Sequence, residues 1–312
     1  MITSSSSKSF HTRRGAAAAA SSSSSSNLPL ASAGCDLAGG VVALGKFDAL
    51  HVGHRALAER AAEIGIPFLL SFSGMAQVLG WEPRLPVVAG CDRKRVMGLW
   101  SHYCRGIVPQ EYTLDFAKVR SLSPQQFVEK LAKELDVKGV VAGSNYRFGY
   151  KAAGDVTDLV RLCKEYGLEA SIVNPVMDTQ EATSSADVGD DGSSRERGQV
   201  STTQVRKALA AGDLKRVANL LGRKHRIILN LHNSVRSGNA LTLSISNVLN
   251  QPPCMGAYNC IVGPQEKFDG NVSELLLAQL KIDASQIEVV LEDKTLAERV
   301  ARFSTIAVEF AV

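Results

Sequence analysis

Two histidines, His51 and His54, stand three residues apart at the end of the ten-residue stretch GKFDALHVGH, residues 45–54. The stretch follows an expected strand and opens an expected helix, so both imidazoles face the same way from the first helical turn. Imidazoles there can donate N–H bonds to phosphate oxygens, and a helix N-terminus adds unpaired N–H groups and the positive end of its dipole. This chemistry is typical of phosphoryl or nucleotidyl transfer.

Gly53 stands between the two histidines and, lacking a Cβ, lets a ligand approach the backbone closely. Residues 45–54 match neither the Gly-x-Gly-x-x-Gly dinucleotide fingerprint nor a Gly-Lys-Ser/Thr phosphate loop, which disfavours hydride transfer and P-loop phosphoryl transfer. Two surface histidines could share this spacing by chance. Their place at a strand-to-helix turn, just after Phe47 and Asp48, favours phosphate binding instead.

A second candidate for phosphate binding is residues 200–206, with the sequence VSTTQVR. Ser201 and Gln204 fit a capping box at the start of a helix, which is a structural role. Capping does not explain Arg206, which lies one turn from the helix start and the hydroxyl of Thr203. Hydroxyls at a helix start with an arginine one turn later predict a second phosphate clamp, which adds donors and a fixed charge.

A third candidate is the loop GSNYRFG, residues 143–149, which follows an expected strand at 138–142. Its position at the carboxyl end of a strand predicts that it lies in the ligand crevice of an open α/β sheet. An ordinary strand-to-helix turn would have a similar composition.

Short apolar runs alternate with amphipathic stretches over residues 41–173. The alternation indicates βαβ units, and hence an α/β, Rossmann-like fold whose parallel sheet is covered by helices on both faces. We expect Trp81 and Trp100 to pack inside the domain and residues 93–95 to form a solvated helix face. The expected strands are 41–45, 67–72, 106–108, 138–142 and 169–173, and the expected helices are 53–64, 92–103, 124–135 and 154–166.

The pattern changes after the last of these strands. Residues 178–199 are rich in acids, serine and glycine and have little to bury, which predicts a solvated, disordered insertion within a domain spanning 37–222. Beyond that domain the apolar period becomes two, which predicts a smaller mixed β domain over 223–312. The expected elements are helices at 202–211 and 213–221 and strands at 226–231, 240–248 and 258–262.

The first 36 residues are rich in serine and alanine and contain no acid before Asp36. This composition predicts an organelle transit peptide over 1–36, for a plastid first and a mitochondrion second, although a disordered tail would also allow it. From Asp36 onward, 32 basic and 31 acidic residues remain. A net charge of +1 leaves no electrostatic footprint for nucleic acid or an anionic membrane, so we expect neither as a partner.

The 312 residues are 45% apolar and 21% charged, a globular composition with room for two domains. There is no run of about 18 uncharged apolar residues, so we expect no membrane-spanning helix. The six cysteines are scattered without a Cys-x-x-Cys pair, which predicts reduced thiols rather than disulfides or a zinc site.

Taken in their order along the chain, the three motifs resemble those of the FAD synthetase family. This family is the nucleotidyltransferase module of prokaryotic-type bifunctional riboflavin kinase/FMN adenylyltransferases. The family hallmarks are Gly-x-Phe-Asp-Gly-x-His-x-Gly-His, Gly-x-x-Phe/Tyr-x-Phe-Gly and Ile-Ser-Ser-Thr-x-Ile-Arg. The resemblance extends from about Val41 to Arg223, and the transit-like N-terminus makes the chain most similar to the plant plastid form. It implies Mg²⁺-dependent transfer of AMP from ATP to FMN, giving FAD and pyrophosphate.

The resemblance also implies roles for single residues. The FMN phosphate would attack the α-phosphorus directly, so positioning and charge neutralisation would provide the catalysis. Asn145 would lie near the flavin or a metal-bound phosphate and Phe148 would contact the flavin, while Mg²⁺ would be held mainly through phosphates without a direct protein ligand. The catalytic residues would be His51, His54 and Arg206, and the ATP-binding residues would be Gly45, Phe47, Asp48, His51, Gly53, His54, Ser201, Thr203 and Arg206.

The sequence departs from the family pattern at three places. Ala49 replaces a glycine, which a negative φ would tolerate, and Thr202 replaces a serine but keeps the hydroxyl. The family's kinase half contains Gly-x-Pro-Thr-Ala-Asn, whereas residues 237–247 have the sequence SGNALTLSISN. We therefore predict a degenerate kinase-like barrel over 223–312, without riboflavin kinase activity.

Three alternatives remain at this point. The chain could be a bifunctional riboflavin kinase/FAD synthetase. It could be a related nucleotidyltransferase acting on pantetheine phosphate, nicotinate mononucleotide or a phospho-alcohol, since phosphate clamping is common to all of these. It could also be a non-catalytic flavin carrier built on a decayed enzyme, against which the intact His51, His54 and Arg206 argue.

Overall fold

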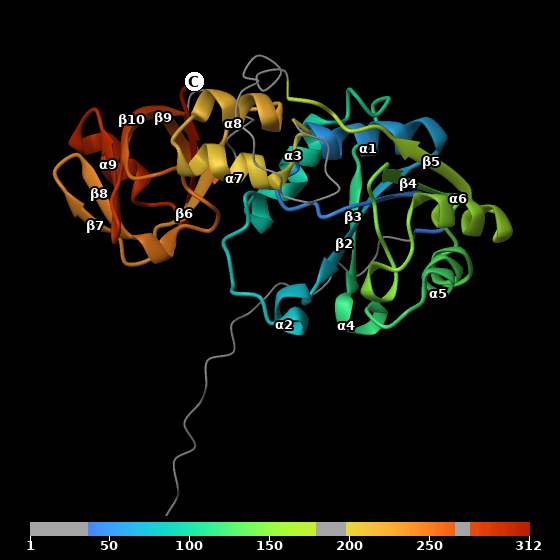
Figure 1. Ribbon diagram of the computed structural model, residues 1–312. Helices are drawn as coiled ribbons and strands as arrows, with labels where there is room; N and C mark the ends of the chain where they lie inside the picture. Colours follow the sequence, from blue (N-terminus) through green and yellow to red (C-terminus); the bar gives the residue numbers. More distant parts are fainter. Residues whose placement is uncertain (1–36, 179–197, 266–274) are drawn as a thin grey trace, which may run out of the picture. The chain divides into compact units, whose positions relative to one another are not determined.

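Five strands from the N-terminal half of the chain pair in parallel in the order β3-β2-β1-β4-β5 (Figure 1). The computed structural model describes residues 37–178, 198–265 and 275–312, so the predicted transit segment and most of the predicted insertion lie outside the described residues. The strands are β1 (Val41–Leu44), β2 (Pro67–Ser73), β3 (Gln110–Asp115), β4 (Gly139–Gly143) and β5 (Glu169–Val173). The intervening elements are α1 (Val52–Ile64), α2 (Met75–Leu79), η1 (Gly90–Asp92), α3 (Arg93–Leu99), α4 (Phe116–Val119), α5 (Pro124–Glu129), the π-helical η2 (Lys130–Glu134), η3 (Tyr150–Ala152) and α6 (Val156–Glu165).

Strand β1 is the centre of this sheet, because Val41 pairs with Pro67 of β2 on one side and with Gly139 of β4 on the other. The strand order reverses between β1 and β4, so their carboxyl ends form the topological switch point where open α/β sheets bind ligands. The loops that begin at Gly45 and Ser144 leave from this edge.

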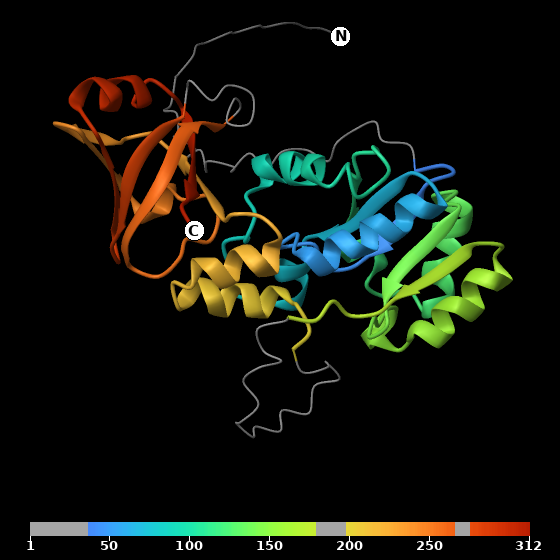
Figure 2. The ribbon, with the colours of Figure 1, turned by 90° about the horizontal axis from the view of Figure 1, so that it is seen from above.

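Helices cover both faces of the sheet because successive strand residues point to opposite sides. Val42 and Leu44 pack in one core cluster with residues of α5 and α6. Val41 and Ala43 pack in another with residues of α1 and α3. Figure 2 shows α1, in blue, lying along the sheet. The predicted α/β Rossmann-like fold, with helices on both faces of a parallel sheet, is therefore confirmed.

Two expected elements in this region are wrong. The structure has no strand at 106–108, a stretch it describes in full, and the third strand is instead β3, an edge strand whose residues are all half-buried or exposed. An edge strand needs no continuous apolar run, so the short apolar stretch before it was misleading. The helix expected over 92–103 ends at Leu99, and the chain continues as turns, with bonds such as Trp100 N to Met97 O at 3.0 Å.

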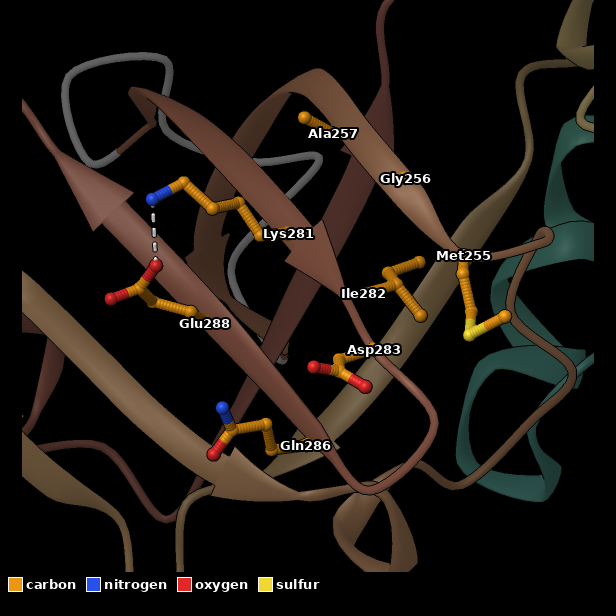
Figure 3. Close-up of a pocket in the computed structure, with 8 residues that line it drawn as sticks. All are labelled: Met255, Gly256, Ala257, Lys281, Ile282, Asp283, Gln286 and Glu288. Carbon is orange, nitrogen blue, oxygen red and sulfur yellow. Dashed lines mark hydrogen bonds and ion pairs between the residues drawn. The ribbon is translucent and has the colours of Figure 1, made fainter.

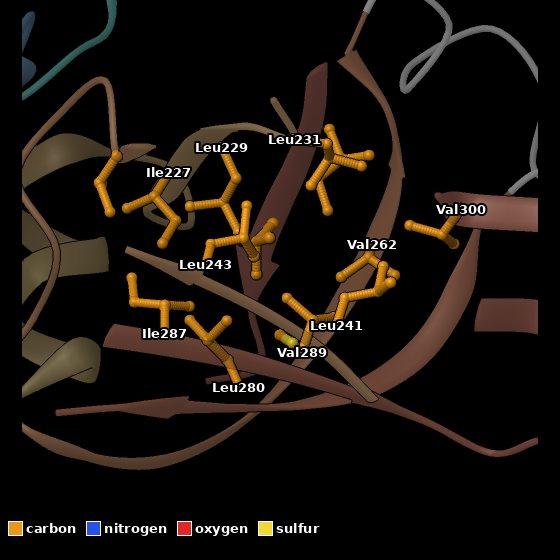
Figure 4. Close-up of a cluster of buried hydrophobic side chains, with 14 of the residues drawn as sticks. Ile227, Leu229, Leu231, Leu241, Leu243, Val262, Leu280, Ile287, Val289 and Val300 are labelled. Atoms are coloured by element: carbon orange, nitrogen blue, oxygen red, sulfur yellow. The ribbon is translucent and has the colours of Figure 1, made fainter. Parts of the chain in front are cut away.

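The second half of the described chain begins with two helices and continues as a seven-stranded antiparallel sheet, in the order β6-β12-β9-β10-β11-β8-β7. The sheet curls into an open half-barrel, and one apolar cluster fills it together with residues of the last helix (Figure 4). The elements are α7 (Thr202–Ala210), α8 (Leu214–Leu221), β6 (Arg226–Asn230), β7 (Val235–Ser237), β8 (Ala240–Ser244), η5 (Ile245–Asn247), β9 (Gly256–Pro264), β10 (Leu276–Ile282), β11 (Gln286–Leu291), α9 (Lys294–Val300) and β12 (Thr305–Phe310).

Asp178 corrects the boundary of the predicted insertion. Its side chain is only 4% exposed and accepts a hydrogen bond from Arg216 at 3.1 Å. A buried carboxylate with an arginine partner belongs to the folded domain rather than to a solvated loop. The cysteines in the described ranges are free thiols, as predicted, and no helix in these ranges is long and apolar enough to cross a bilayer.

The close pairing of β4 with β5 makes Gly139 a sensitive position. A Cβ on Gly139 would meet the backbone oxygen of Glu169 at 2.9 Å, whereas a Cβ on Gly143, at the other end of β4, has no atom closer than 3.7 Å. We expect Gly139→Ala to destabilise the fold by about 1–3 kcal/mol, because the backbone must shift to accept the methyl group. Urea denaturation checks this, with Gly143→Ala as the matched control, and equal stability of the two variants would contradict it.

Candidate active site

The β1–α1 loop places His51 at the N-cap of α1, just before the first helical residue. His51 is the N-cap of α1, with an extended backbone, and its Nδ1 accepts a hydrogen bond from the His54 N–H at 3.3 Å. The imidazole thus takes the place of the Ser or Asp oxygen that usually caps a helix. The helix starts at Val52, one residue before the predicted start.

The two imidazoles lie against each other at the start of α1. Their rings stack with centroids 3.6 Å apart at 17°, and His51 and His54 are only 6% and 7% exposed. The Phe47 ring meets His54 edge-on at 4.9 Å. A Cβ on Gly53 would meet the His51 ring at 3.2 Å, so glycine leaves room here for the imidazole itself.

Burial keeps both histidines neutral. Desolvation, aided by the Arg223 charge, lowers the pKa of His51 to about 3. Desolvation also lowers the pKa of His54 well below its usual value, with smaller contributions from His51, Arg93 and Arg223. Since His51 Nδ1 accepts a hydrogen bond, the proton of its neutral ring is on Nε2. The imidazoles can therefore donate hydrogen bonds, and the positive charge of the site must come from other side chains.

His54 Nδ1 is a buried polar atom without a hydrogen-bond partner among the described residues. Buried polar atoms in folded proteins are nearly always paired, so an orphaned one suggests a missing ligand or water. Its position beside the helix N-terminus is compatible with a phosphate oxygen.

The segment 200–206 contacts the β1–α1 loop. Ser201 caps α7 by accepting from the Gln204 N–H at 3.3 Å, and Arg206, one turn later, donates to Asp48 Oδ2 at 2.8 Å. The carbonyl of Val200 lies 3.9 Å from the position a Cβ would take on Gly53. Thr203, in contrast, is exposed.

Arg223 binds the backbone of the β1–α1 loop, a role that the sequence did not reveal. Its guanidinium donates to the carbonyls of Leu50 at 2.6 Å and Ala49 at 3.0 Å. Leu50 has a φ of 47°, whereas Ala49 is not among the residues with positive φ, so the family's missing glycine causes no backbone strain at Ala49. Arg223 follows the expected helix at 213–221, and nothing in the local sequence indicates that its guanidinium contacts the loop.

Arg93 holds the other end of the loop, which contradicts the expected solvated face. It donates to the Phe47 carbonyl at 2.7 Å and pairs with Glu111 through two bonds of 2.7 and 2.5 Å. Arg95 pairs with Asp92 at 2.7 Å, and both arginine side chains are only 17% exposed. The charges of Arg93 and Arg95 are therefore structural, whereas Lys94 is exposed, as expected.

The third predicted motif approaches the second. Asn145, which is exposed, donates to the Gln199 side chain at 2.9 Å, just before the cap of α7. Phe148 is 5% exposed and packs in the core, with its ring centroid 5.9 Å from that of Phe127. Its predicted flavin contact stays a prediction, and in this structure the ring contributes to the core.

The two tryptophans differ. Trp100 is 3% exposed and packs in the core as predicted, but Trp81 is 49% exposed and the packing prediction for it is wrong. The Lys46 ammonium lies 5.1 Å from the Trp81 ring centroid. This contact places an exposed aromatic side chain next to the β1–α1 loop.

The C-terminal sheet has a separate hollow of about 370 Å³, lined by residues of β9, β10 and β11 and the adjoining turns (Figure 3). Lys281 and Glu288, two of the lining residues, form an ion pair 2.8 Å long. None of the predicted site residues lines this hollow.

Comparison with known proteins places these features in a family. The family model described as FAD synthetase matches residues 92–187. The chain is 50% identical over 280 residues to FAD synthetase 2, chloroplastic, of Arabidopsis thaliana, covering 88% of this chain and 73% of that one. The chain belongs to the FAD synthetase family. As a member it is an FMN adenylyltransferase, an enzyme of the nucleotidyltransferase class.

Other relatives agree with this assignment. FAD synthetase 1, chloroplastic, of Arabidopsis thaliana is 48% identical over 88% of this chain and 77% of its own length. A bifunctional riboflavin kinase/FMN adenylyltransferase of Listeria monocytogenes is 31% identical over 58% of this chain and 53% of its own. Among solved structures, a macrolide-efflux protein of Streptococcus pneumoniae shares the fold, with a TM-score of 0.64, 22% identity and coverage of 88% and 84%.

The lowered histidine pKa values predict a pH-dependent stability. Because the pKa of His51 is about 3 in the fold and about 6.5 in the unfolded chain, the unfolded state binds more protons between these values. This contribution to stability is complete above pH 6.5 and is lost as the pH falls towards 3. We expect His51→Asn, which keeps a capping side chain, to lose less stability than the wild type between pH 7.5 and 5 in urea titrations.

His232→Asn is the matched control, because His232 is exposed. It should follow the wild-type pH dependence. A His51→Asn curve parallel to the wild type would show that His51 is not buried in its neutral form.

Proposed function

We propose that the β1–α1 loop and the start of α7 together hold the triphosphate of ATP while AMP is transferred to FMN. The observation behind this is the 2.8 Å bond between Arg206 and Asp48, which joins the two predicted phosphate motifs at the carboxyl end of β1. The stacked pair His51 and His54 lies in the same loop, at the N-terminus of α1. The imidazole donors, the N-terminus of α1 and the Arg206 guanidinium would thus all serve the triphosphate at the carboxyl edge of the sheet.

In the proposed reaction an oxygen of the FMN phosphate attacks the α-phosphorus of ATP. The new O–P bond joins FMN to AMP as FAD, while the bond from the α-phosphorus to the bridging oxygen breaks and pyrophosphate leaves. No covalent enzyme intermediate is formed. The enzyme contributes by aligning the two phosphates and by stabilising the charge that develops on the leaving pyrophosphate.

The neutral histidines act as hydrogen-bond donors to the phosphates. His51 has its proton on Nε2, and the unpaired Nδ1 of His54 gains a partner when substrate binds. Arg206 supplies the fixed positive charge. Gly45, Phe47 and Asp48 shape the loop, and Ser201 and Thr203 place hydroxyls at the start of α7.

For the acceptor, we propose that FMN approaches from the β4 side of the switch point. Asn145 is exposed there and is tied to Gln199, close to the cap of α7. Because Asn145 is exposed, its amide is accessible to the flavin or to a phosphate.

We propose that Mg²⁺ enters with the triphosphate. The described residues contain no group of three His, Cys, Asp or Glu side chains that could hold a metal ion, and both oxygens of Asp48 are already hydrogen-bonded, to Val87 N–H and Arg206. This donor set fits an ion that is bound mainly by phosphate oxygens and water. The ion would supply charge neutralisation on the phosphates.

We propose that the C-terminal sheet has no riboflavin kinase activity. Residues 237–247 form β8 and a 3-10 turn in place of the phosphate-binding segment. The side chain of Asn247 donates to the carbonyls of Asn230 and His232 at 2.8 Å each, so it is engaged in structure.

We propose a plastid location. The serine- and alanine-rich, acid-free composition of the first 35 residues supports it, and the two Arabidopsis relatives are named as chloroplastic. The mitochondrial alternative has no support from these names.

His54→Ala tests the phosphate role of the histidine pair. We expect FAD formation from FMN and ATP to fall by about 100-fold or more, because a preorganised donor to the phosphates is lost. FMN binding, measured by quenching of flavin fluorescence, should be largely unchanged. His232→Ala controls for removal of an exposed histidine, and a His54→Ala variant with wild-type turnover would refute the role.

Product analysis tests the acceptor and the missing kinase activity. We expect the pure chain to make FAD and pyrophosphate from FMN and ATP and to make no FMN from riboflavin and ATP, as followed by chromatography with mass detection. Appreciable FMN formation would favour the bifunctional alternative. Turnover of pantetheine phosphate or nicotinate mononucleotide in preference to FMN would favour another nucleotidyltransferase.

A further inference from the structure

A closed ring of hydrogen bonds connects the proposed phosphate site to the C-terminal sheet region. Asp48 Oδ1 accepts from the Val87 N–H at 3.1 Å, and the Val87 carbonyl accepts from the Asn250 side chain at 2.9 Å. On the other side, Arg206 donates to Asp48 at 2.8 Å and to the side-chain oxygen of Gln251, the residue after Asn250. Two adjacent residues, Asn250 and Gln251, therefore support the two halves of the Asp48–Arg206 pair.

The C-terminal side of this ring is firmly held. Asn250 is fully buried, accepts from the Ile228 N–H at 2.9 Å and donates to the Arg226 carbonyl at 2.9 Å, which ties it to β6. The Gln251 N–H donates to the Pro86 carbonyl at 2.8 Å, and its own carbonyl bonds to His225 Nε2 at 2.8 Å. Because the backbone N–H and carbonyl of Gln251 are both hydrogen-bonded, its side chain leaves the backbone in a defined direction.

Arg206 has three acceptors within the described chain. These are Asp48 Oδ2, the Leu85 carbonyl at 2.9 Å and the Gln251 side-chain oxygen. A guanidinium has five N–H donors, so two remain for a phosphate. The three bonds fix the plane of a long, flexible side chain and thus the direction of the two remaining donors.

We propose that Gln251 is a positioning residue for adenylyl transfer, acting through Arg206 and not by touching substrate. The proposal rests on the proposed role of Arg206 in holding the triphosphate. It gives the C-terminal region a function in the transferase reaction that needs no kinase chemistry.

Gln251→Leu removes the acceptor at similar side-chain size and leaves both backbone bonds in place. The guanidinium then keeps Asp48 and Leu85 but can rotate about them, and a misplacement of about 1 Å can cost about 100-fold in rate. We expect kcat for FAD formation to fall about 10- to 100-fold. The KM for FMN and the melting temperature should change little. Gln251→Glu, which keeps an acceptor oxygen, should restore most of the rate.

A double-mutant cycle separates positioning from simple stabilisation. In an Arg206→Ala background, Gln251→Leu should have no further effect on kcat, because the side chain that it orients is gone. Gln279→Leu, an exposed glutamine on β10, is the matched control and should be neutral.

The outcomes are distinct. FAD formation by the wild-type chain tests the proposed function by itself. If the wild type makes FAD and Gln251→Leu has the same kcat, or lowers kcat equally with and without Arg206, the positioning role is refuted and the proposed function stands. If Gln251→Leu lowers the rate only when Arg206 is present, and Gln251→Glu restores it, the role is established.

Discussion

The hydrogen-bonded ion pair between Asp48 and Arg206 joins side chains 158 positions apart in the sequence. Both are half-buried, so the pair is less screened by solvent than a surface salt bridge and gains directional strength as a charge-assisted bond. It brings the start of α7 to the loop that follows β1. The proposed site depends on this contact, because the stacked histidines of the β1–α1 loop are neutral and Arg206 brings the fixed positive charge to that loop.

Charge and hydrogen bonding are divided between different side chains in the β1–α1 loop. Desolvation lowers the pKa of His51 and His54, and the half-buried Arg223 lowers both further. Arg223 and Arg93 also bind the loop carbonyls, so the groups that shape the loop are the same ones that oppose protonation of its histidines. The result is a pair of neutral donors that stay neutral at physiological pH, with Arg206 as the cation.

The C-terminal half-barrel has the sequence SGNALTLSISN at residues 237–247 and not Gly-x-Pro-Thr-Ala-Asn, and buried polar contacts connect it to the transferase region. Arg226 pairs with Glu309 at 3.0 Å and lies 3.7 Å from Asp92, which itself pairs with Arg95. Buried charges are costly unless they are paired, so removal of one partner would penalise the whole set. Such contacts give a physical reason for the sheet to be retained as part of the folded enzyme.

The sequence by itself determined the local features. The alternation of strands and helices, the paired histidines of a first helical turn and the cap at Ser201 depend on residues within one strand or one turn, and all are observed. The family resemblance rested on the same local motifs. Only the tertiary structure decided the edge strand β3, the burial of Phe148 and the contacts of Arg93 and Arg223 with the loop. Those two arginines bind backbone carbonyls 46 and 173 positions away, and a carbonyl oxygen, which every residue has, leaves no trace in the sequence.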